Sequence, residues 1–384
     1  MRFRIAILLF VAQSAFGQTR ARDIGIPFDG TPGPLNAITD VRGVEVGMVT
    51  INRDEPVAVR TGVTAILPRG KSGAASPVFG AWFPLNGNGE MTGTHWLEES
   101  GFLEGPIMIT NTHSVGVVRD AVVKWQVQHK ALYQDYTYPI VAETYDGYLN
   151  DINGFHVKPE DALAALDNAT AGTPVAEGAV GGGTGMICYE FKCGTGTSSR
   201  VITAGGNRYT IGVLVQANHG ARHQLLVAGV PVGQFLSDGA PFTSGRDYDN
   251  EQGSIIIVVA TDAPLLPHQL RRLAKRAALG LARTGARAGN GSGDIFIAFS
   301  TANPHAADKD QTLASVNFVP NERLSLVFNA VVLATEEAVM NALVAGRSMT
   351  GIEGHHVDGI PIDRLRDVLR QHNRLNEQTP RSTR

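Results

Sequence analysis

The chain has 384 residues, of which 43% are hydrophobic and 18% are charged, and its formal net charge at pH 7 is -3. This length and apolar content are enough for one large hydrophobic core or two modest ones, which excludes a disordered or coiled-coil chain. The small net charge gives no electrostatic footprint for nucleic acid, so we expect no nucleic-acid partner.

The chain begins with a pattern typical of a secretory signal peptide. Arg2 and Arg4 form a basic start, and residues 5–12 form an apolar run that is too short to span a membrane stably. Small residues at Ala15 and Gly17 occupy the two positions that a signal peptidase reads, so we predict a signal peptide over residues 1–17 and cleavage before Gln18. The alternative, a buried first strand, leaves the two arginines unexplained.

No later segment of the sequence reaches the roughly 18 apolar residues needed to span a membrane. We therefore expect a secreted protein that has no membrane association once the signal is removed. For a Gram-negative bacterial source, the expected location is the periplasm.

The hydrophobic pattern predicts strands and helices that alternate along most of the chain. The strands are predicted over residues 61–67, 106–110, 186–191, 209–216, 223–232, 254–260 and 295–300, and the helices over 114–129, 161–167, 267–281, 325–345 and 362–374. Strands mixed with long helices indicate an α/β layered architecture.

The helix predicted over 325–345 carries one apolar stripe at a spacing of three and four residues. The stripe consists of Phe328, Val331, Val332, Thr335, Val339 and Ala342. Glu336 and Glu337 lie next to it, which leaves two alternatives: one of them faces the protein interior, or both are exposed.

Two short motifs in the middle of the chain have competing interpretations. The glycine cluster 181–185 lacks the Lys-Ser/Thr pair of a phosphate-binding loop, so we interpret it as a flexible wall close to an active site. Cys188 and Cys193 could form a disulfide across a local turn in an oxidising compartment. They could equally be free thiols, because a spacing of five places them on opposite faces of a straight strand, and the sequence leaves both possibilities open.

The junction between Gly253 and Ser254 is where chemistry is indicated most clearly. Residues 237–253 are rich in glycine and acidic residues and predict an exposed, mobile loop, whereas residues 255–260 are apolar and predict a buried strand. Because Gly253 has no Cβ, it can adopt a strained backbone that lets the Ser254 hydroxyl reach the preceding carbonyl.

An N-to-O acyl shift at that point, followed by hydrolysis, would make Ser254 a new N-terminus. Its α-amine, with an ordinary pKa of about 7.7 to 8.0, suits a general base at neutral pH, so one residue would supply both nucleophile and base. The alternative is that Ser254 only begins a strand.

Several stretches of the sequence, in order, resemble the DmpA or P1 (S58) peptidase family. These are the N-terminal-nucleophile aminopeptidases, which include L-aminopeptidase/D-esterases and β-peptidyl aminopeptidases. The matching stretches are 25–28, 36–41, 43–47, 143–147, 149–151, 177–178, 181–187, 212–218, 254–275, 291–294 and 334–338. Together they span nearly all of the chain after residue 22.

The resemblance implies a four-layer αββα sandwich of the DmpA/ornithine-acetyltransferase type. It implies an α subunit of residues 18–253 and a β subunit of residues 254–384, both forming one catalytic domain, and a homo-oligomer of such αβ heterodimers. No metal and no organic cofactor is implied.

The resemblance also assigns roles to individual residues around the nucleophile, Ser254. Ser292 and Asp294 would orient and tune the Ser254 hydroxyl and amine, and Asn218 would donate its amide N–H to the oxyanion. Glu143 would hold the free ammonium of the substrate. Tyr145 would line the same pocket.

Some of these assignments have structural alternatives. In some β-peptidyl members the position of Asp294 is a glutamate, so this residue departs from their pattern. Asp294 could pair with Arg283 or Arg287 as a strand-entry acid. Asn218 could be a turn residue, and Glu143 could be a solvated loop carboxylate.

The function that we predict is an exported, autoprocessed serine aminopeptidase that acts on small peptides, amides or esters through an acyl-enzyme on Ser254. Its preference among α-L, D and β-amino acids is left open. The alternatives are an acyltransferase of the ornithine acetyltransferase type, whose nucleophile is a threonine, and an uncleaved, non-catalytic binding protein.

Overall fold

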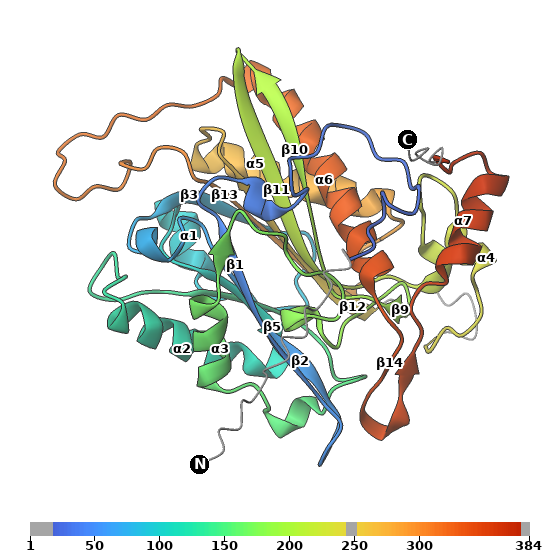
Figure 1. Ribbon diagram of the computed structural model, residues 1–384. Coiled ribbons are helices and arrows are strands. Elements are labelled where there is room, and N and C mark those ends of the chain that lie inside the picture. Colours follow the sequence, from blue (N-terminus) through green and yellow to red (C-terminus); the bar gives the residue numbers. More distant parts are fainter. Residues whose placement is uncertain (1–17, 243–251, 378–384) are drawn as a thin grey trace, which may run out of the picture.

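The computed structural model describes residues 18–242 and 252–377 (Figure 1). The predicted signal peptide, residues 1–17, lies outside the described residues, as do residues 243–251 of the predicted mobile loop. The described part of that loop, residues 237–242, forms no helix or strand and is largely exposed.

Two β-sheets form the centre of the molecule. The first has the order β6-β5-β2-β1-β7 and consists of β1 Glu45–Arg53, β2 Val59–Leu67, β5 Ile107–Asn111, β6 Ile140–Thr144 and β7 Thr170–Ala171. The second has the order β10-β11-β12-β13-β3-β4 and consists of β3 Val78–Pro84, β4 Phe102–Leu103, β10 Thr195–Ala204, β11 Asn207–Asn218, β12 Gln252–Thr261 and β13 Gly291–Ser300. Two small hairpins are formed by β8 Ile187–Cys188 with β9 Phe191–Lys192, and by β14 Met349–Thr350 with β15 His356–Val357.

Helices cover the outer face of each sheet. The α-helices are α1 Thr94–Ser100, α2 Val115–Gln128, α3 Pro159–Asp167, α4 Val232–Phe235, α5 Pro267–Arg283, α6 Leu324–Ala345 and α7 Ile362–Gln371. Short 3-10 helices are η1 Ile38–Asp40, η2 Lys71–Gly73, η3 Thr112–Ser114, η4 Ile152–Gly154, η5 Gly181–Gly183, η6 Arg222–Gln224, η8 Asn321–Arg323 and η9 Ile352–Gly354.

Three apolar cores separate four layers. One core lies between α2–α3 and the first sheet, a second lies between the two sheets, and a third lies between the second sheet and α5–α6 (Figure 1). Strand β12 shows why: Ile255 and Ile257 face the helices, while Ile256 and Val258 face the other sheet, and all four are fully buried. The expected αββα sandwich is confirmed.

The positions of β11, β12 and β13 bring residues from separate segments together at one end of these central strands of the second sheet. Strands β12 and β13 run parallel and are connected through α5, since a parallel pair requires a crossover. Strand β11 runs antiparallel to β12, so its last residue, Asn218, pairs with Ser254. The beginning of β13 pairs Ser292 with Gly253 and Asp294 with Ile255.

Helix α6 is more deeply buried than one apolar stripe predicts. Every residue from Ala334 to Ala345 is buried, including Glu336 and Glu337. The segment Asn321–Ala345 is long and apolar enough to cross a membrane by length and composition, but 83% of its apolar window is buried in the molecule. Its apolar sequence therefore reflects its position in the core.

Several predicted elements differ in the structure. The strand predicted over 223–232 is wrong: the segment contains η6, a Val227–Val230 bridge and the start of α4, because Gly229 turns the chain at a φ of +79°. The strand predicted over 186–191 is the β8–β9 hairpin instead. Strands β1, β3, β6 and β10 were not predicted, nor were the two-residue strands β4, β7, β14 and β15. In β1 and β10 polar and apolar residues are mixed without a clear period, whereas β3 is interrupted by a glycine and β6 is only five residues long.

The β8–β9 hairpin resolves the question of the two cysteines, because Cys188 and Cys193 form a disulfide across its turn. The glycine cluster lies close to the candidate active site, as expected, because Gly185 lines that cleft, but its other glycines are packed inside the molecule. Gly181, Gly182 and Gly183 are buried, and a Cβ on Gly182 would lie 2.1 Å from the Gln216 Oε1 atom. These glycines allow close packing between the sheets.

Candidate active site

A cleft of about 1010 Å³ opens at the edge where β11, β12 and β13 meet the ends of β5 and β6. Gly253, Ser254, Asn218, Glu143 and Tyr145 all line it. A second cavity, of about 650 Å³, lies between the β10–β11 turn and the loop before α6, and none of these five residues lines it.

Ser254 lines the cleft and is only 5% exposed. Its hydroxyl donates a hydrogen bond to the Gly253 carbonyl oxygen at 2.7 Å. Gly253 has a φ of +144°, and a Cβ there would lie 2.3 Å from the Asn218 carbonyl oxygen. Only glycine fits this position, which places the serine hydroxyl against the peptide bond that precedes it.

Ser292 and Asp294 lie on β13 beside this junction, and both are buried. The Ser292 hydroxyl donates a hydrogen bond to Asp294 Oδ1 at 2.7 Å. Arg283, one of the two arginines considered as a structural partner of Asp294, pairs with Glu336 instead. The serine and the carboxylate thus form a hydrogen-bonded pair on the strand next to Ser254.

The side-chain amide of Asn218 is held at both ends. Asn218 Oδ1 accepts a hydrogen bond from the Ile187 backbone N–H at 2.8 Å, and Nδ2 donates one to the Tyr145 carbonyl oxygen at 2.8 Å. These two contacts assign the orientation of the amide. Since Nδ2 carries a second N–H, it can offer that donor to an oxygen in the cleft. Asn218 is the last residue of β11 rather than a turn residue.

Glu143 is a buried carboxylate near the end of β6, not a solvated one. Its Oε1 accepts a hydrogen bond from the Glu90 backbone N–H at 2.9 Å, and its Oε2 accepts one from the Thr112 hydroxyl at 2.5 Å. Burial raises the pKa of Glu143, while these two hydrogen bonds oppose that rise. A buried carboxylate that faces a cleft is suited to bind a cation.

Gly89 connects the carboxylate to the strand next to Ser254. A Cβ on Gly89 would lie 3.2 Å from Glu143 Oε1 and 3.2 Å from the Cα of Gly293. Gly293 pairs with Ser254 in the sheet. The loop after β3 therefore packs between Glu143 and the β12–β13 edge, and brings these two parts of the cleft close together.

Tyr145 contributes at the rim. Its side chain is 53% exposed, and its ring packs over Gly147, where an added Cβ would lie 2.3 Å from the hydroxyl oxygen. Its backbone carbonyl is the group that holds Asn218. Tyr145 therefore contributes to the cleft in two ways: its ring lies at the rim, and its backbone carbonyl holds the Asn218 side chain.

Sequence reasoning missed an aromatic wall on the cleft. The rings of Tyr148 and His355 are stacked with centroids 4.3 Å apart, and Phe242 meets Tyr148 edge-on at 4.6 Å. It also missed Thr112 and Glu90, which hold Glu143. No local signal could have found them, because each comes from a separate segment and they meet only in the fold.

His219 also lines the cleft but is buried. Burial lowers its pKa to about 3, so the imidazole is neutral at physiological pH. Across residues 18–242 and 252–377, no group of three or more His, Cys, Asp or Glu side chains is arranged to hold a metal ion.

Comparisons with known proteins show the family of the chain. The family model of peptidase family S58 matches residues 36–357. A β-peptidyl aminopeptidase, BapA, of Sphingosinicella microcystinivorans is 54% identical over 96% of this chain and 96% of its own length. A second one, from Sphingosinicella xenopeptidilytica, is 46% identical over 95% of this chain and 94% of its own length.

A solved structure gives the same fold. The L-aminopeptidase D-Ala-esterase/amidase of Ochrobactrum anthropi, a prototype of the serine aminopeptidases with a variant of the Ntn-hydrolase fold, superimposes with a TM-score of 0.87 at 51% identity. The match covers 93% of this chain and 99% of that one. The chain therefore belongs to peptidase family S58 and is a serine aminopeptidase.

Proposed function

We propose that the protein is exported, cleaves itself between Gly253 and Ser254, and then releases N-terminal residues from small peptides, amides or esters through an acyl-enzyme on Ser254. The observation that carries this proposal is the Ser254 hydroxyl, 2.7 Å from the Gly253 carbonyl oxygen at a position where only glycine fits. The same cleft holds an amide donor and a buried carboxylate.

Self-cleavage would proceed by an N-to-O acyl shift. Ser254 Oγ attacks the carbonyl carbon of Gly253, the C–N bond breaks, and the nitrogen leaves as the protonated α-amine of Ser254. Water then hydrolyses the ester, which gives a carboxylate on Gly253 and restores the hydroxyl. The positive φ of Gly253 allows the backbone to bend toward the hydroxyl.

Turnover would use the same atoms on a substrate. The Ser254 hydroxyl attacks the substrate carbonyl while its own α-amine takes the proton, and the Ser292–Asp294 pair orients the serine. The second N–H of Asn218 stabilises the oxyanion, a contribution of about 2.7 to 4 kcal/mol for one preorganised donor. The leaving amine or alcohol takes the proton, and water hydrolyses the acyl-enzyme.

Substrate choice would depend on Glu143. Its carboxylate, when ionised, binds the free ammonium of the substrate, which restricts cleavage to the first residue. The relatives at 54% and 46% identity are β-peptidyl aminopeptidases, whereas the solved structure at 51% is an L-aminopeptidase and D-Ala-esterase. We infer that N-terminal β-amino acids are accepted, and that the two chains assemble as a homo-oligomer of αβ heterodimers.

The substrate assignment is tested with a panel of p-nitroanilides. The mature enzyme is assayed on β-homoalanyl, L-alanyl and D-alanyl p-nitroanilides, each beside its N-acetylated counterpart as the matched control. We expect the β-homoalanyl compound to be hydrolysed and every N-acetylated compound to be resistant. Equal rates on free and acetylated substrates would contradict the role of Glu143, and no rate on the β-homoalanyl compound would contradict the substrate class.

Export is tested separately by fractionation. We expect the α chain in the periplasmic fraction to begin at Gln18. An α chain that retains residues 1–17 in the cytoplasm would contradict the proposal.

A further inference from the structure

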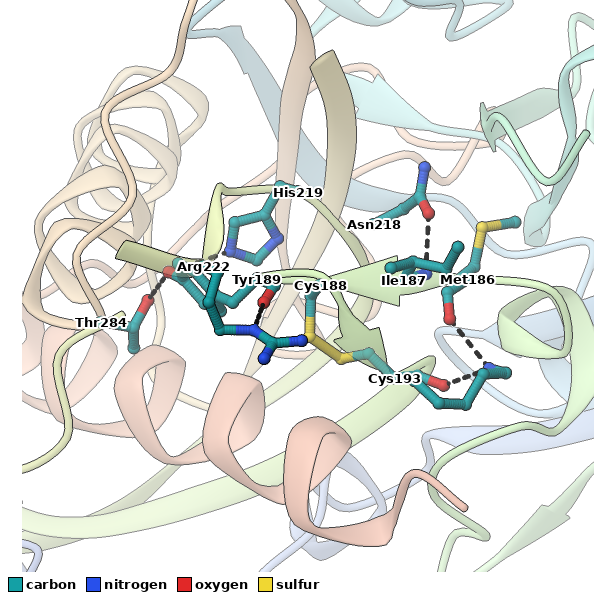
Figure 2. Close-up of a disulfide and its surroundings, with 10 residues drawn as sticks. Met186, Ile187, Cys188, Tyr189, Cys193, Asn218, His219, Arg222 and Thr284 are labelled. Carbon is teal, nitrogen blue, oxygen red and sulfur yellow. Dashed lines mark hydrogen bonds between the residues drawn. A yellow bond between two sulfur atoms is a disulfide. The ribbon is translucent and has the colours of Figure 1, made fainter. Parts of the chain in front are cut away.

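The β8–β9 hairpin and the residue that follows it carry the only two cysteines of the sequence, beside Asn218 (Figure 2). The Cys188–Cys193 disulfide joins its first strand to the residue after its second, with Cα atoms 5.4 Å apart. Both cysteines are fully buried, and Glu190, in the turn, lines the cleft. The disulfide is thus part of the wall behind the candidate oxyanion donor.

The turn of this hairpin is one that its own residues disfavour. Tyr189 and Glu190 have φ values of +50° and +59°, in the left-handed region. A two-residue hairpin turn of this kind favours Asn-Gly, because side chains with a Cβ resist positive φ. Surrounding contacts therefore hold the turn in place.

The first strand of the hairpin holds Asn218 directly. The Ile187 N–H, immediately before Cys188, donates the hydrogen bond that fixes Asn218 Oδ1 at 2.8 Å (Figure 2). Two residues after Ile187, in the turn, the Tyr189 N–H donates a hydrogen bond to the His219 carbonyl oxygen at 2.7 Å. The orientation of the Asn218 amide thus depends on where β8 lies.

We propose that the Cys188–Cys193 disulfide is a positioning device for Asn218. By tying β8 to the end of β9, it keeps the Ile187 N–H on Asn218 Oδ1, and so keeps the second N–H of Asn218 Nδ2 aimed at the oxyanion. Full catalytic rate then requires the oxidised pair. This inference rests on the proposed function, in which Asn218 is the oxyanion donor.

Other contacts hold the rest of the hairpin. The fully buried Lys192 donates from Nζ to the carbonyl oxygens of Met186 at 2.8 Å and Cys193 at 2.7 Å. Arg222 donates from Nε to the Tyr189 carbonyl oxygen at 2.9 Å, and its guanidinium lies 3.3 Å from the centre of the Phe191 ring. Loss of the disulfide therefore loosens β8 without unfolding the hairpin. It should lower kcat rather than disrupt the fold.

A double-mutant cycle tests this positioning role. The variants are Cys188→Ala/Cys193→Ala, Asn218→Ala and the triple variant, and only fully processed protein is assayed on one p-nitroanilide substrate. We expect the disulfide variant to lose between about tenfold and a hundredfold in kcat with KM changed by no more than about twofold. Asn218→Ala should lose about a hundredfold to a thousandfold, and the triple variant should lose no more than Asn218→Ala.

Two controls separate positioning from general destabilisation. Val122→Ala removes a buried side chain from the core between α2–α3 and the first sheet, and it should lower the melting temperature while kcat stays unchanged. If the cysteine variant does not mature, mature wild-type enzyme is reduced instead with an excess dithiol. That step converts the disulfide to two thiols while the dithiol becomes its cyclic disulfide, and mass spectrometry after thiol alkylation counts the reduced pairs.

The outcomes distinguish this inference from the proposed function. If Asn218→Ala keeps the wild-type kcat, the oxyanion role of Asn218 fails and the inference fails with it. If Asn218→Ala loses activity but the enzyme without the disulfide does not, the inference is overturned while the proposed function stands. Independent losses that multiply in the triple variant also overturn it, because the disulfide would then act elsewhere.

Discussion

At the scale of single residues, the proposed chemistry depends most directly on Gly253 and Ser254. The Gly253 backbone has a φ of +144°, a conformation that a side chain would strain, and it is packed against the carbonyl of Asn218. The Ser254 hydroxyl thus lies next to the Gly253–Ser254 peptide bond, which it can attack. Asn218, which pairs with Ser254 in the sheet, can stabilise the oxyanion that forms. Substitutions at Gly253 or Ser254 should therefore change the rates of self-cleavage and turnover more than they change the stability of the fold.

Replacement of Gly253 by alanine should slow self-cleavage. The added Cβ would lie 2.3 Å from the Asn218 carbonyl oxygen, so the junction must shift away from the geometry of attack. We expect precursor to accumulate, with a processing half-time at least about tenfold longer. A time course of purified precursor on a denaturing gel measures it.

Gly172→Ala is the matched control, because Gly172 also has a positive φ, of +61°, but nothing lies within 4 Å of the added Cβ. It should process at the wild-type rate. Normal processing of Gly253→Ala would show that the tight packing at this glycine has no part in cleavage.

Replacement of Glu143 by glutamine should weaken binding of substrates with a free amine. Loss of a charged hydrogen bond of about 1.5–3 kcal/mol corresponds to a KM about tenfold to a hundredfold higher. Only the ionised carboxylate binds an ammonium, so kcat/KM of the wild type should fall as pH falls through the pKa of Glu143. Because burial raises that pKa, the fall should begin above the range of an ordinary glutamate.

The pH profile of kcat/KM for wild type and Glu143→Gln checks this account. The part of the acidic limb that Glu143 causes should disappear in the variant, while the limb set by the Ser254 α-amine, the general base, remains. Glu90→Gln is the companion variant: it keeps the backbone N–H that Glu143 accepts but removes a nearby charge that raises the pKa of Glu143, so its acidic limb should remain and move to lower pH. An unchanged acidic limb in Glu143→Gln would assign the titration to another group.

At the scale of elements, the structure explains which parts of the site the sequence could predict. Ser254 and Gly253 are adjacent in sequence, and a loop followed by a buried strand marks them locally. Asn218 and Asp294 were assigned through family resemblance, and strand register then places them beside the nucleophile. The hydrogen bond from Thr112 to Glu143 could not be predicted, because it depends on the parallel pairing of β5 with β6.

Helix α6, in the core, is a second element whose burial the sequence could predict only in part. Its period predicted one buried face and left the position of the two glutamates open, but all of its second half is buried. Glu337 is fully buried and pairs with Arg22 and Arg200, which come from distant segments. No pattern within the helix could indicate those partners.

Glu337→Gln should therefore destabilise the protein strongly. Burial would raise the pKa of Glu337, but hydrogen bonds and charges from Arg22 and Arg200 lower it overall. A lowered folded pKa contributes stability that is present above the ordinary glutamate range and is lost as pH falls through the folded value. The variant should lose about 3–5 kcal/mol at neutral pH, and less at acidic pH.

Urea denaturation at pH 7 and pH 4 measures this difference. The neighbouring Glu336→Gln is the comparison: Glu336 is also buried, but its partner Arg283 has a half-exposed side chain that stays solvated when unpaired, so this variant should lose less stability than Glu337→Gln. Equal losses in the two variants would contradict the assignment of a buried ion-pair cluster to Glu337.

At the scale of the whole molecule, the proposed cut divides the chain but not the core. In the second sheet, β13 and all of β12 except its first two residues follow the cut, and they lie between β11 and β3, which precede it. The four-layer architecture came from family resemblance, whereas periodicity alone indicated only an α/β protein. The layer order depends on contacts between distant strands, which no local pattern contains.

The two chains should consequently remain together and unfold together after cleavage. We expect one cooperative thermal transition for the processed enzyme, seen alike by circular dichroism and calorimetry, and co-elution of both chains from a size-exclusion column without denaturant. Two separate transitions, or a dissociated β chain in native buffer, would contradict the shared core.

The most direct test of the central claim is intact-mass spectrometry with N-terminal sequencing of the exported, active protein, beside a Ser254→Ala variant. The account predicts two chains for the wild type, one ending at Gly253 and one beginning at Ser254, and one uncut, inactive chain for the variant. A fully active preparation whose chain runs intact through Gly253–Ser254 would contradict it.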